Sequence, residues 1–258
     1  MSHTSLPHDA LGSLERGIEI LMCLTGPPLD MARIRKLTGL PRTTAYRLLA
    51  ILRDGGLIRS TDGGYELGGH LAALMATYQS RMRGHRRDVL PHVLSLYEST
   101  RQTVNVGVPQ GLAVRYTERI YGHNRTASRS DGVDTAPLHC TAIGKVLLAF
   151  DPGLQRDMLG SGPLPQLARR TITRRAVLER ELALIRNEGV AYAQEEFDEG
   201  LMCAAAPVFG PGGECRMAIG VASPVRGTPL SRLGPAVALA ARQASDTLGQ
   251  HLKAPPGE

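Results

Sequence analysis

The chain is poor in aromatic side chains and in cysteine. Its 258 residues include no Trp, three Phe and four Cys. The cysteines are widely separated and form no CxxC pair, so the sequence indicates neither a disulfide framework nor a zinc ribbon. We expect reduced thiols, as in a protein of the cytosol. They are Cys23, Cys140, Cys203 and Cys215.

Signals for membranes and for common enzyme families are also missing. No stretch approaches 18 uninterrupted apolar residues, and the first dozen residues lack a basic end followed by an apolar run. We therefore expect a soluble, cytoplasmic protein with no membrane partner. No Walker-type, GxSxG or GxGxxG sequence stands in a suitable context. His139 and Cys140 are adjacent, which suits a nucleophile and its base poorly because neighbouring strand residues point to opposite faces.

One acidic cluster is the only candidate for a cation site. It lacks the spacing of an EF-hand, and a solvated loop is the commoner outcome for such a run. We predict no metal site, no cofactor and no catalytic residue, and hence no enzyme. The cluster comprises Glu195, Glu196, Asp198 and Glu199.

Basic charge is concentrated near the N-terminus. Residues 31–60 hold seven Lys and Arg against one acidic residue, Asp54, and this excess equals the net charge of +6 of the whole chain. A local basic patch favours contact with a polyanion, with an affinity that falls as salt rises.

A helix and a hairpin are predicted within residues 40–67. Pro41 suits the first turn of a helix, and Gly55 with Gly56 supplies its end. Between them apolar residues recur at helical spacing, so the helix packs by one face and offers the other. The apolar stripe comprises Ala45, Leu48, Leu49 and Leu52. The turn at residues 62–64, Asp-Gly-Gly, is strong hairpin chemistry.

Two earlier helices complete this pattern. Residues 29–38 form a short helix capped by Asp30, and residues 13–25 form an amphipathic first helix. Its predicted apolar stripe comprises Leu14, Ile18, Leu21, Met22 and Leu24. Three helices followed by a hairpin make a winged helix-turn-helix.

The offered helix face suits the major groove of DNA. Arg can bond guanine in bidentate fashion, Thr can donate to bases or touch the thymine methyl, and Tyr can reach phosphate. A surface helix whose arginines are only solvated is the alternative. The predicted DNA-binding residues are Arg33, Arg42, Thr43, Thr44, Tyr46, Arg47 and, on the wing, Arg59.

We predict a winged domain at 10–69, a linker helix at 70–87 and a second domain at 88–252. The linker carries an apolar side that either forms a dimer contact or packs back onto the winged domain. That side comprises Leu71, Leu74, Met75 and Tyr78.

The second domain mixes helices and strands without regular βαβ alternation. This indicates an α+β layer structure with a mainly antiparallel sheet. Helices are predicted at 89–100, 141–150, 173–188 (capped by Thr173 and ended by Gly189) and 231–252. Strands are predicted at 103–108, 112–120, 191–194, 203–209 and 217–223.

Several separated blocks, in the right order, resemble the IclR family of bacterial transcriptional regulators. The resemblance covers about Leu14 to Leu248 and includes LERGIEIL, LTGLPRTTAYRLLAILRDGGLI, GGYELG, PLHCTAIGKVLLA and EEFDEGLMCAAAPVF. It implies a winged helix-turn-helix, a linker helix and a C-terminal GAF-like domain that binds a small effector. It also implies homodimers, often paired into tetramers, on palindromic operator DNA.

The resemblance also places an effector pocket. Polar side chains occur in relatives that bind small oxo-acids at the positions of Ala193, Gly220 and Ala222, where this chain has none. We therefore expect a roomier, more apolar pocket for an aromatic or otherwise bulkier organic acid. Tight packing of the sheet is the alternative reason for these small residues. The implied effector-binding residues are Thr141, Ala142, Ile143, Gly144, Ala193, Cys203, Gly220 and Ala222, with helix N–H groups near residue 141 as the anion site.

The sequence thus predicts a DNA-binding transcriptional regulator whose operator affinity is modulated by a small organic acid. Two rival hypotheses remain. A thiol-dependent enzyme or redox sensor would need Cys140 or Cys203 exposed with a lowered pKa. A pure protein-interaction module would ignore DNA.

Overall fold

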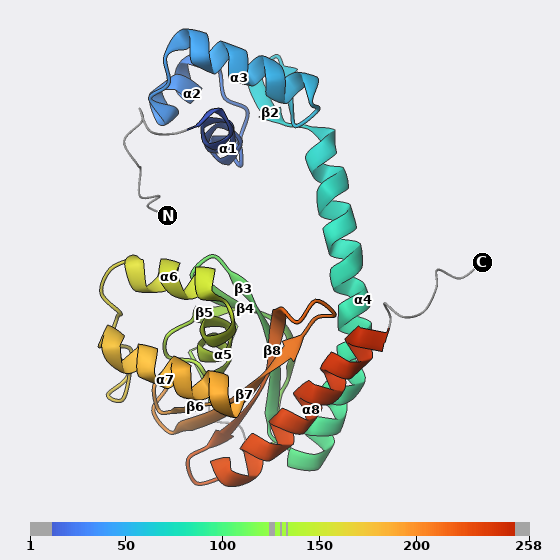
Figure 1. Cartoon of the computed structure of the whole chain (residues 1–258), viewed down its shortest axis with the longest axis vertical. Helices are drawn as coiled ribbons and strands as arrows, with labels where there is room; N and C mark the ends of the chain where they lie inside the picture. The colour runs from blue at the N-terminus through green and yellow to red at the C-terminus, as the bar shows by residue number, and fades with distance from the viewer. Residues whose placement is uncertain (1–11, 124–126, 130, 133, 251–258) are drawn as a thin grey trace, which may run out of the picture. The chain divides into compact units, whose positions relative to one another are not determined.

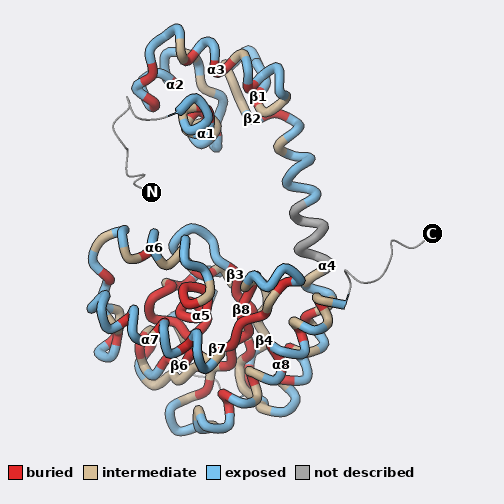
Figure 2. The backbone as a smooth tube through the Cα atoms, viewed as in Figure 1, coloured by how far each residue is buried: buried red, intermediate tan, exposed pale blue. Residues whose placement is uncertain are grey.

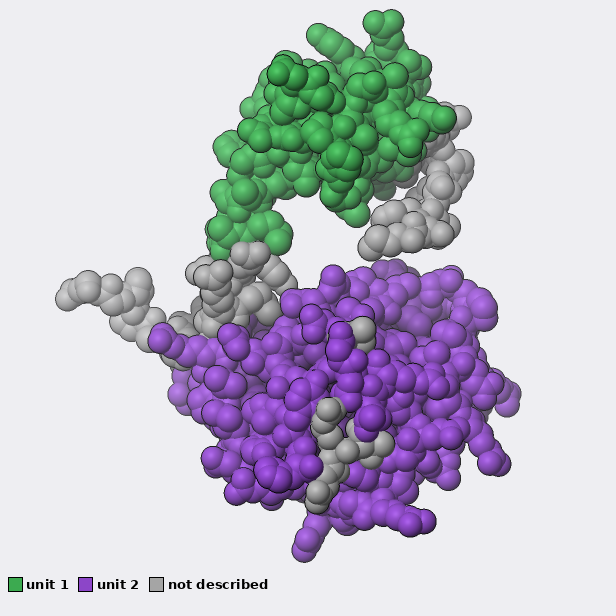
Figure 3. Space-filling view, turned by 180° about the vertical axis from the view of Figure 1, so that it is seen from behind, with its two compact units in different colours: residues 1–84 green, residues 85–258 purple. Residues whose placement is uncertain are grey.

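A computed structural model describes residues 12–123, 127–129, 131–132 and 134–250, apart from the side chains of residues 78–84. The chain forms two compact units, Met1–Gly84 and His85–Glu258 (Figure 3). The ends that we predicted for the two domains, at residues 10 and 252, lie outside the described residues.

Before α4 (Gly69–Thr100), whose first part also belongs to it, unit 1 contains three helices and a hairpin. They are α1 (Ser13–Cys23), α2 (Met31–Thr38), α3 (Arg42–Asp54), β1 (Ile58–Thr61) and β2 (Gly64–Leu67) (Figure 1). Its core is formed by apolar residues from all three helices, from their connections and from β1. The core residues are Ile20, Leu24, Ile34, Leu40, Ala45, Leu48, Leu49, Leu52 and Ile58.

Local chemistry explains where the helices of unit 1 begin and end. The Asp30 side chain accepts a hydrogen bond from the Arg33 N–H at 2.7 Å and caps α2. Gly39 ends α2 with φ of 67°, a conformation that glycine adopts without strain. Pro41 is the N-cap of α3 and Gly55 is its C-cap, so both predicted limits hold to within one residue.

The predicted apolar stripe of α1 is wrong for three of its members. Ile20 and Leu24 are buried, but Leu14, Ile18 and Met22 are 77%, 49% and 46% exposed. This helix is apolar on two neighbouring faces, and periodicity alone does not say which face meets the core.

The predicted hairpin is present, and the segment before α2 pairs with it through a single bridge. β1 and β2 pair in antiparallel register from Ile58 opposite Leu67 to Thr61 opposite Gly64. Leu29 bridges to Tyr65 through two backbone hydrogen bonds of 2.8 and 3.0 Å. The wing is therefore anchored to the segment that leads into α2.

A single helix, α4 (Gly69–Thr100), stands where we predicted two helices. Pro91 lies inside it, and Val89, Val93 and Leu96 are buried, so packing in unit 2 holds the segment around the proline in helical form. In the predicted linker, Leu71 is half-buried, while Leu74 and Met75 are 63% and 53% exposed. The side chain of Tyr78 is outside the described residues.

Unit 2 is built on a six-stranded sheet of order β5-β4-β3-β8-β7-β6, in which every pairing is antiparallel. The mainly antiparallel sheet that we predicted is confirmed. The strands are β3 (Thr103–Gln110), β4 (Ala113–Ile120), β5 (Thr135–Pro137), β6 (Ala191–Gln194), β7 (Leu201–Phe209) and β8 (Cys215–Pro224).

Helices cover both faces of this sheet. One face carries α5 (Ala142–Phe150), α6 (Pro152–Gly160) and α7 (Arg175–Glu188), and the other carries α8 (Leu230–Gln250) (Figure 1). The unit-2 part of α4 lies beside α8, where His92 Nε2 is 2.9 Å from Thr247 Oγ1. Among the described residues, no helix has the length and hydropathy needed to cross a membrane.

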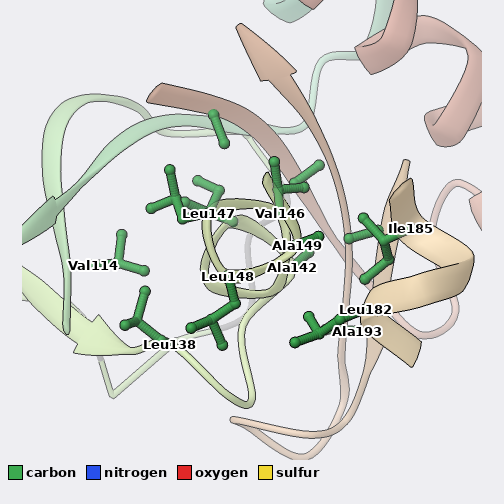
Figure 4. Packing of buried hydrophobic residues seen from close by; sticks show 14 of the residues in the cluster. Val114, Leu138, Ala142, Val146, Leu147, Leu148, Ala149, Leu182, Ile185 and Ala193 are labelled. Atoms are coloured by element: carbon green, nitrogen blue, oxygen red, sulfur yellow. The ribbon is translucent and has the colours of Figure 1, made fainter. Parts of the chain in front are cut away.

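Helix α5 is the centre of the main core of unit 2. Apart from Lys145 it consists of apolar residues and glycine, and its residues from Ala142 to Ala149 are all buried. Leu147 and Leu148 pack toward Val114 and Leu138 on one side, and Ile185 of α7 lies on the other (Figure 4). The buried residues of the unit accordingly gather in α5 and the middle strands (Figure 2).

Three local predictions for unit 2 were incomplete or wrong. The short strand β5 and helix α6 were not predicted. The N-cap of α7 is Arg174 rather than Thr173, and it makes no side-chain cap. Gly189 ends α7 with φ of 73°, as predicted.

Candidate functional site

The outer face of α3 presents the side chains that we predicted for DNA. Arg42, Thr43 and Arg47 are exposed, and Tyr46 is 68% exposed. Thr44 is half-buried and is the least accessible of the set. Arg33 on α2 is also exposed. The helix is held by its opposite face, so it offers a fixed polar surface.

Two of these arginines already have partners in unit 1. Arg47 Nη2 lies 3.5 Å from the Ser13 hydroxyl of α1, a long contact. Arg59 on β1 forms an ion pair with Glu66, its register partner on β2. The Arg59 side chain is nevertheless 70% exposed, and an ion pair at such a surface contributes little to stability.

Unit 2 contains a cavity between the sheet and the start of α5. Its volume is about 70 Å³, several times the roughly 10–15 Å³ that one water molecule needs. Seven of the eight predicted effector residues line it. They are Thr141, Ala142, Ile143, Ala193, Cys203, Gly220 and Ala222.

Strand register explains why residues so distant in sequence meet here. Directly paired residues of an antiparallel sheet share a face. Cys203 of β7 pairs with Ala193 on one side and with Ala222 on the other, and Ala222 pairs in turn with Thr103. A single row across four strands therefore forms part of the cavity wall.

Gly220 lines the cavity, and it is also closely packed against α5. A Cβ at this position would lie 2.8 Å from Cγ1 of Ile143, and one at Gly107 would lie 2.7 Å from its Cγ2. Ile143 of α5 thus packs directly on the backbone of β3 and β8. Close packing of α5 on the sheet accounts for the lack of a side chain at Gly220, whereas Ala193 and Ala222 carry their methyl groups at the cavity.

The eighth predicted residue, Gly144, is not among the described residues that line the cavity. Its N–H donates to the Thr141 hydroxyl at 3.1 Å, which is the N-cap of α5. A Cβ there would lie 2.2 Å from the Leu138 carbonyl oxygen, so Gly144 serves the close approach of helix and loop. The Gly144 N–H at the start of α5 is therefore already bonded within the helix cap.

The acidic cluster is not the solvated loop that we predicted. Glu196 and Asp198 are buried and line the cavity. The Lys145 ammonium, with no exposed surface, contacts Glu196 at 2.8 Å and Glu181 at 3.2 Å. Burial raises the pKa of Glu196, and Lys145 opposes that rise. The pair fixes α5 to the 195–200 loop.

Asp198 connects the 195–200 loop to the segment that contains Ser128 and Arg129. Its carboxylate accepts hydrogen bonds from the Ser128 hydroxyl at 2.6 Å and from the Arg129 N–H at 3.1 Å. The Arg129 guanidinium is 3.4 Å from the same carboxylate. Ser128 and Asp198 both line the cavity, so these bonds lie along one of its sides. No local pattern predicts them, because the partners are 70 residues apart.

The two cysteines at the cavity are poor nucleophiles. Burial raises the pKa of both Cys140 and Cys203 to about 12, so both remain thiols at neutral pH. Burial also lowers the pKa of His139, whose Nε2 lies 2.9 Å from the Pro165 carbonyl oxygen. This is the opposite of an activated thiol, and it removes the support for a thiol-dependent enzyme.

Family models match both units. The IclR helix-turn-helix domain matches residues 13–62, and the C-terminal domain of bacterial transcriptional regulator IclR matches residues 84–246. The chain belongs to the IclR family. It is accordingly a transcriptional regulator rather than an enzyme, and its helix-turn-helix makes DNA its partner.

Relatives support this membership over most of the chain. The glycerol operon regulatory protein of Streptomyces griseus is 32% identical over 246 residues, which is 92% of this chain and 96% of that protein. An HTH-type transcriptional regulator of Mycobacterium tuberculosis is 32% identical over 200 residues, 76% of each chain.

Solved structures agree with the IclR fold. The IclR protein of Thermotoga maritima aligns with a TM-score of 0.60 and 25% identity, covering 92% of this chain and 98% of that one. An IclR homologue of Microbacterium hydrocarbonoxydans, solved in complex with 4-hydroxybenzoate, aligns with a TM-score of 0.61 and 23% identity over 92% and 99% of the two chains. The second likeness concerns the fold alone.

Sequence reasoning missed most of the polar lining of the cavity. The IclR resemblance drew attention to α5 and to strands β6 to β8, whereas the other wall comes from β3, β4 and the loop that follows β4. The missed polar and aromatic residues include Thr103, Asn105, Tyr116, Arg119, Tyr121, Ser128, Asp131, Glu196 and Asp198.

Proposed function

We propose that this IclR-family regulator binds operator DNA through α3 and the wing, and that a small organic acid in the unit-2 cavity modulates this binding. The observation that supports the DNA surface is the exposed face of α3, where Arg42, Tyr46 and Arg47 stand on a helix anchored by a buried stripe. Arg47 contributes base recognition, and Arg59 on the wing contributes contact with phosphate.

The effector is an aromatic or otherwise bulkier organic acid. Ala193 and Ala222 leave room at the cavity and offer no side-chain hydrogen bond, while Tyr116 adds an aromatic wall. Such a lining favours an apolar body that carries a few polar groups. The homologue from Microbacterium hydrocarbonoxydans was solved with 4-hydroxybenzoate, which makes this compound a reasonable first probe.

The coupling between the two sites is thermodynamic linkage. An effector that binds one arrangement of the regulator more tightly shifts the population toward it, and operator affinity changes by the same factor as effector affinity. The buried Lys145–Glu196 pair connects the cavity lining to α5.

The regulator acts as a dimer, and α1 supplies part of the contact. Leu14, Ile18 and Met22 recur every four residues and form an exposed apolar stripe on unit 1. A second copy of the same stripe is a suitable cover, because two-fold contacts use the same surface on both subunits. Two reading helices then match half-sites spaced by about one helical turn or a multiple of it.

Gel shifts at several salt concentrations test the DNA assignment. On operator and random DNA, Arg47→Ala should reduce the preference for operator by about 1–3 kcal/mol, whereas Arg59→Ala should weaken both complexes alike and lower the salt slope by about one. Arg156→Ala on α6 serves as the control. An Arg47→Ala protein that matches the parent on both DNAs would refute the role of Arg47.

Thermal-shift screening tests the effector class. We expect stabilisation by benzoate-type acids and little by glyoxylate or pyruvate. Stabilisation by the two- and three-carbon acids, but by no larger acid, would contradict the proposal.

A further inference from the structure

The cavity has one basic corner, and it lies on β4. Arg119 is the only Lys or Arg among the described residues that line the cavity. Its guanidinium carbon lies 4.6 Å from the ring centre of Tyr116 and 5.8 Å from that of Tyr121, and Nη1 donates to the Tyr121 hydroxyl at 3.3 Å. Stacked rings hold a guanidinium in a fixed plane.

A β-bulge produces this arrangement. Tyr116 and Arg119 are three residues apart, so in a regular strand they would point to opposite faces. The register between β3 and β4 shifts at Val106/Gly107, so that Asn105 pairs with Arg119 and Gly107 pairs with Tyr116. Since residues 105 and 107 share a face, the bulge turns both side chains toward α5.

Asn105 completes the polar corner. It pairs with Arg119 on β4 and with Gly220 on β8, and it lines the cavity. Its Oδ1 is buried and has no hydrogen-bond partner among the residues that the structure describes. A buried amide group without a partner is uncommon in proteins and calls for an explanation, such as a ligand. An asparagine can present either its oxygen or its NH₂ group to such a ligand.

The start of α5 is the weaker place for an anion. The Gly144 N–H is already bonded to the Thr141 hydroxyl, and the Ile143 side chain packs on the strands. A guanidinium carries a full charge and has five N–H donors, so it can bind a carboxylate while it keeps its other contacts.

We infer that Arg119 binds the carboxylate of the effector and that Asn105 orients it through a hydrogen bond. This inference rests on the proposed acid effector. It places the carboxylate of the effector at β4 rather than at the N–H groups of α5, where we first expected it. The row formed by Ala193, Cys203 and Ala222 then accommodates the apolar body of the acid.

The test compares acids with their methyl esters. The probes are benzoate and 4-hydroxybenzoate with the corresponding esters, and the measurement is calorimetric titration of the full-length protein. We expect the natural protein to prefer the acids. Arg119→Gln should lose about ten-fold or more in affinity for the acids and change little toward the esters. Arg119→Lys keeps the positive charge but lacks the two parallel N–H donors of a guanidinium. Its affinity for the acids should lie between those of the parent and of Arg119→Gln.

Arg115→Gln is the matched control, because Arg115 lies on the same strand outside the cavity lining. It should bind the acids like the parent. The melting temperature of each variant without ligand shows whether it is folded.

Three results would overturn the inference. If Arg119→Gln binds the acids as tightly as the parent, the carboxylate lies elsewhere, while the effector proposal stands. If acids and esters bind the natural protein equally, no residue recognises the carboxylate, and this result does not depend on any variant. If none of the acids binds the natural protein, both the inference and the proposed effector class fail.

Discussion

The Lys145 ammonium has no contact with solvent and depends on two carboxylates, Glu196 and Glu181. Removing one partner of a buried ion pair leaves the other charge without compensation. We predict that Lys145→Met lowers the free energy of unfolding by about 3–5 kcal/mol. Urea unfolding measures this loss.

The matched control is Glu181→Gln. The Glu181 side chain is 32% exposed, so its loss should cost about 1 kcal/mol or less. Equal effects of the two substitutions would contradict the central role of the Lys145–Glu196 contact.

The Cys140 thiol makes the free energy of unfolding depend on pH in the alkaline range. Burial raises its pKa to about 12 in the folded state, whereas an unfolded cysteine ionises near its reference pKa of about 8.5. Between these values the unfolded state has lost a proton that the folded state keeps, so stability falls as pH rises. The slope contributed by this thiol is about 1.4 kcal/mol per pH unit.

Urea unfolding at pH 8, 9 and 10 measures that slope. The Cys140→Ala protein should show a shallower fall than the parent, since it lacks the thiol. An unchanged slope would mean that Cys140 ionises in the folded protein.

At the level of single elements, the wing offers a sharp comparison between adjacent glycines. Gly64 has φ of 118°, and a Cβ there would lie 2.4 Å from the Leu29 carbonyl oxygen. At Gly63 the nearest atom to such a Cβ is a Pro28 carbon at 3.4 Å, an ordinary contact. Only Gly64 is therefore required by the Leu29–Tyr65 bridge.

We predict that Gly64→Ala destabilises unit 1 by about 1–3 kcal/mol and weakens DNA binding, because the wing must shift. Gly63→Ala should be nearly neutral. Thermal unfolding and gel shifts of the two variants give the comparison, and equal behaviour would refute this view of the wing.

At the level of the whole molecule, the exposed stripe of Leu14, Ile18 and Met22 on α1 is the proposed contact between two copies of the chain. We predict that Ile18→Glu shifts the protein toward monomers and lowers operator affinity, because a charge in an apolar contact is costly to bury. Sedimentation velocity measures the shift. Leu37→Glu, an equivalent change at a 52% exposed leucine of α2, is the control and should leave assembly unchanged. A dimer that survives Ile18→Glu would place the contact elsewhere.

Much of the fold was predictable because its signals are local. The end of α7 at Gly189, the cap of α2 at Asp30 and the wing turn all depend on residues within a few positions of one another. β5 was missed because a strand of three residues has too few positions to show alternation. The break predicted in α4 was wrong because buried contacts in unit 2 outweighed the local signal.

The sequence by itself determined the helix-turn-helix, the IclR family and the strands of the second unit other than β5, since each is carried by local patterns or motifs. Only the tertiary structure decided which face of α1 is buried and which residues meet at the cavity. Arg119 comes beside Tyr116 through a bulge, and Glu196 meets Lys145 across 51 residues. Such meetings depend on register and packing between distant segments, and no local pattern in a single sequence encodes them.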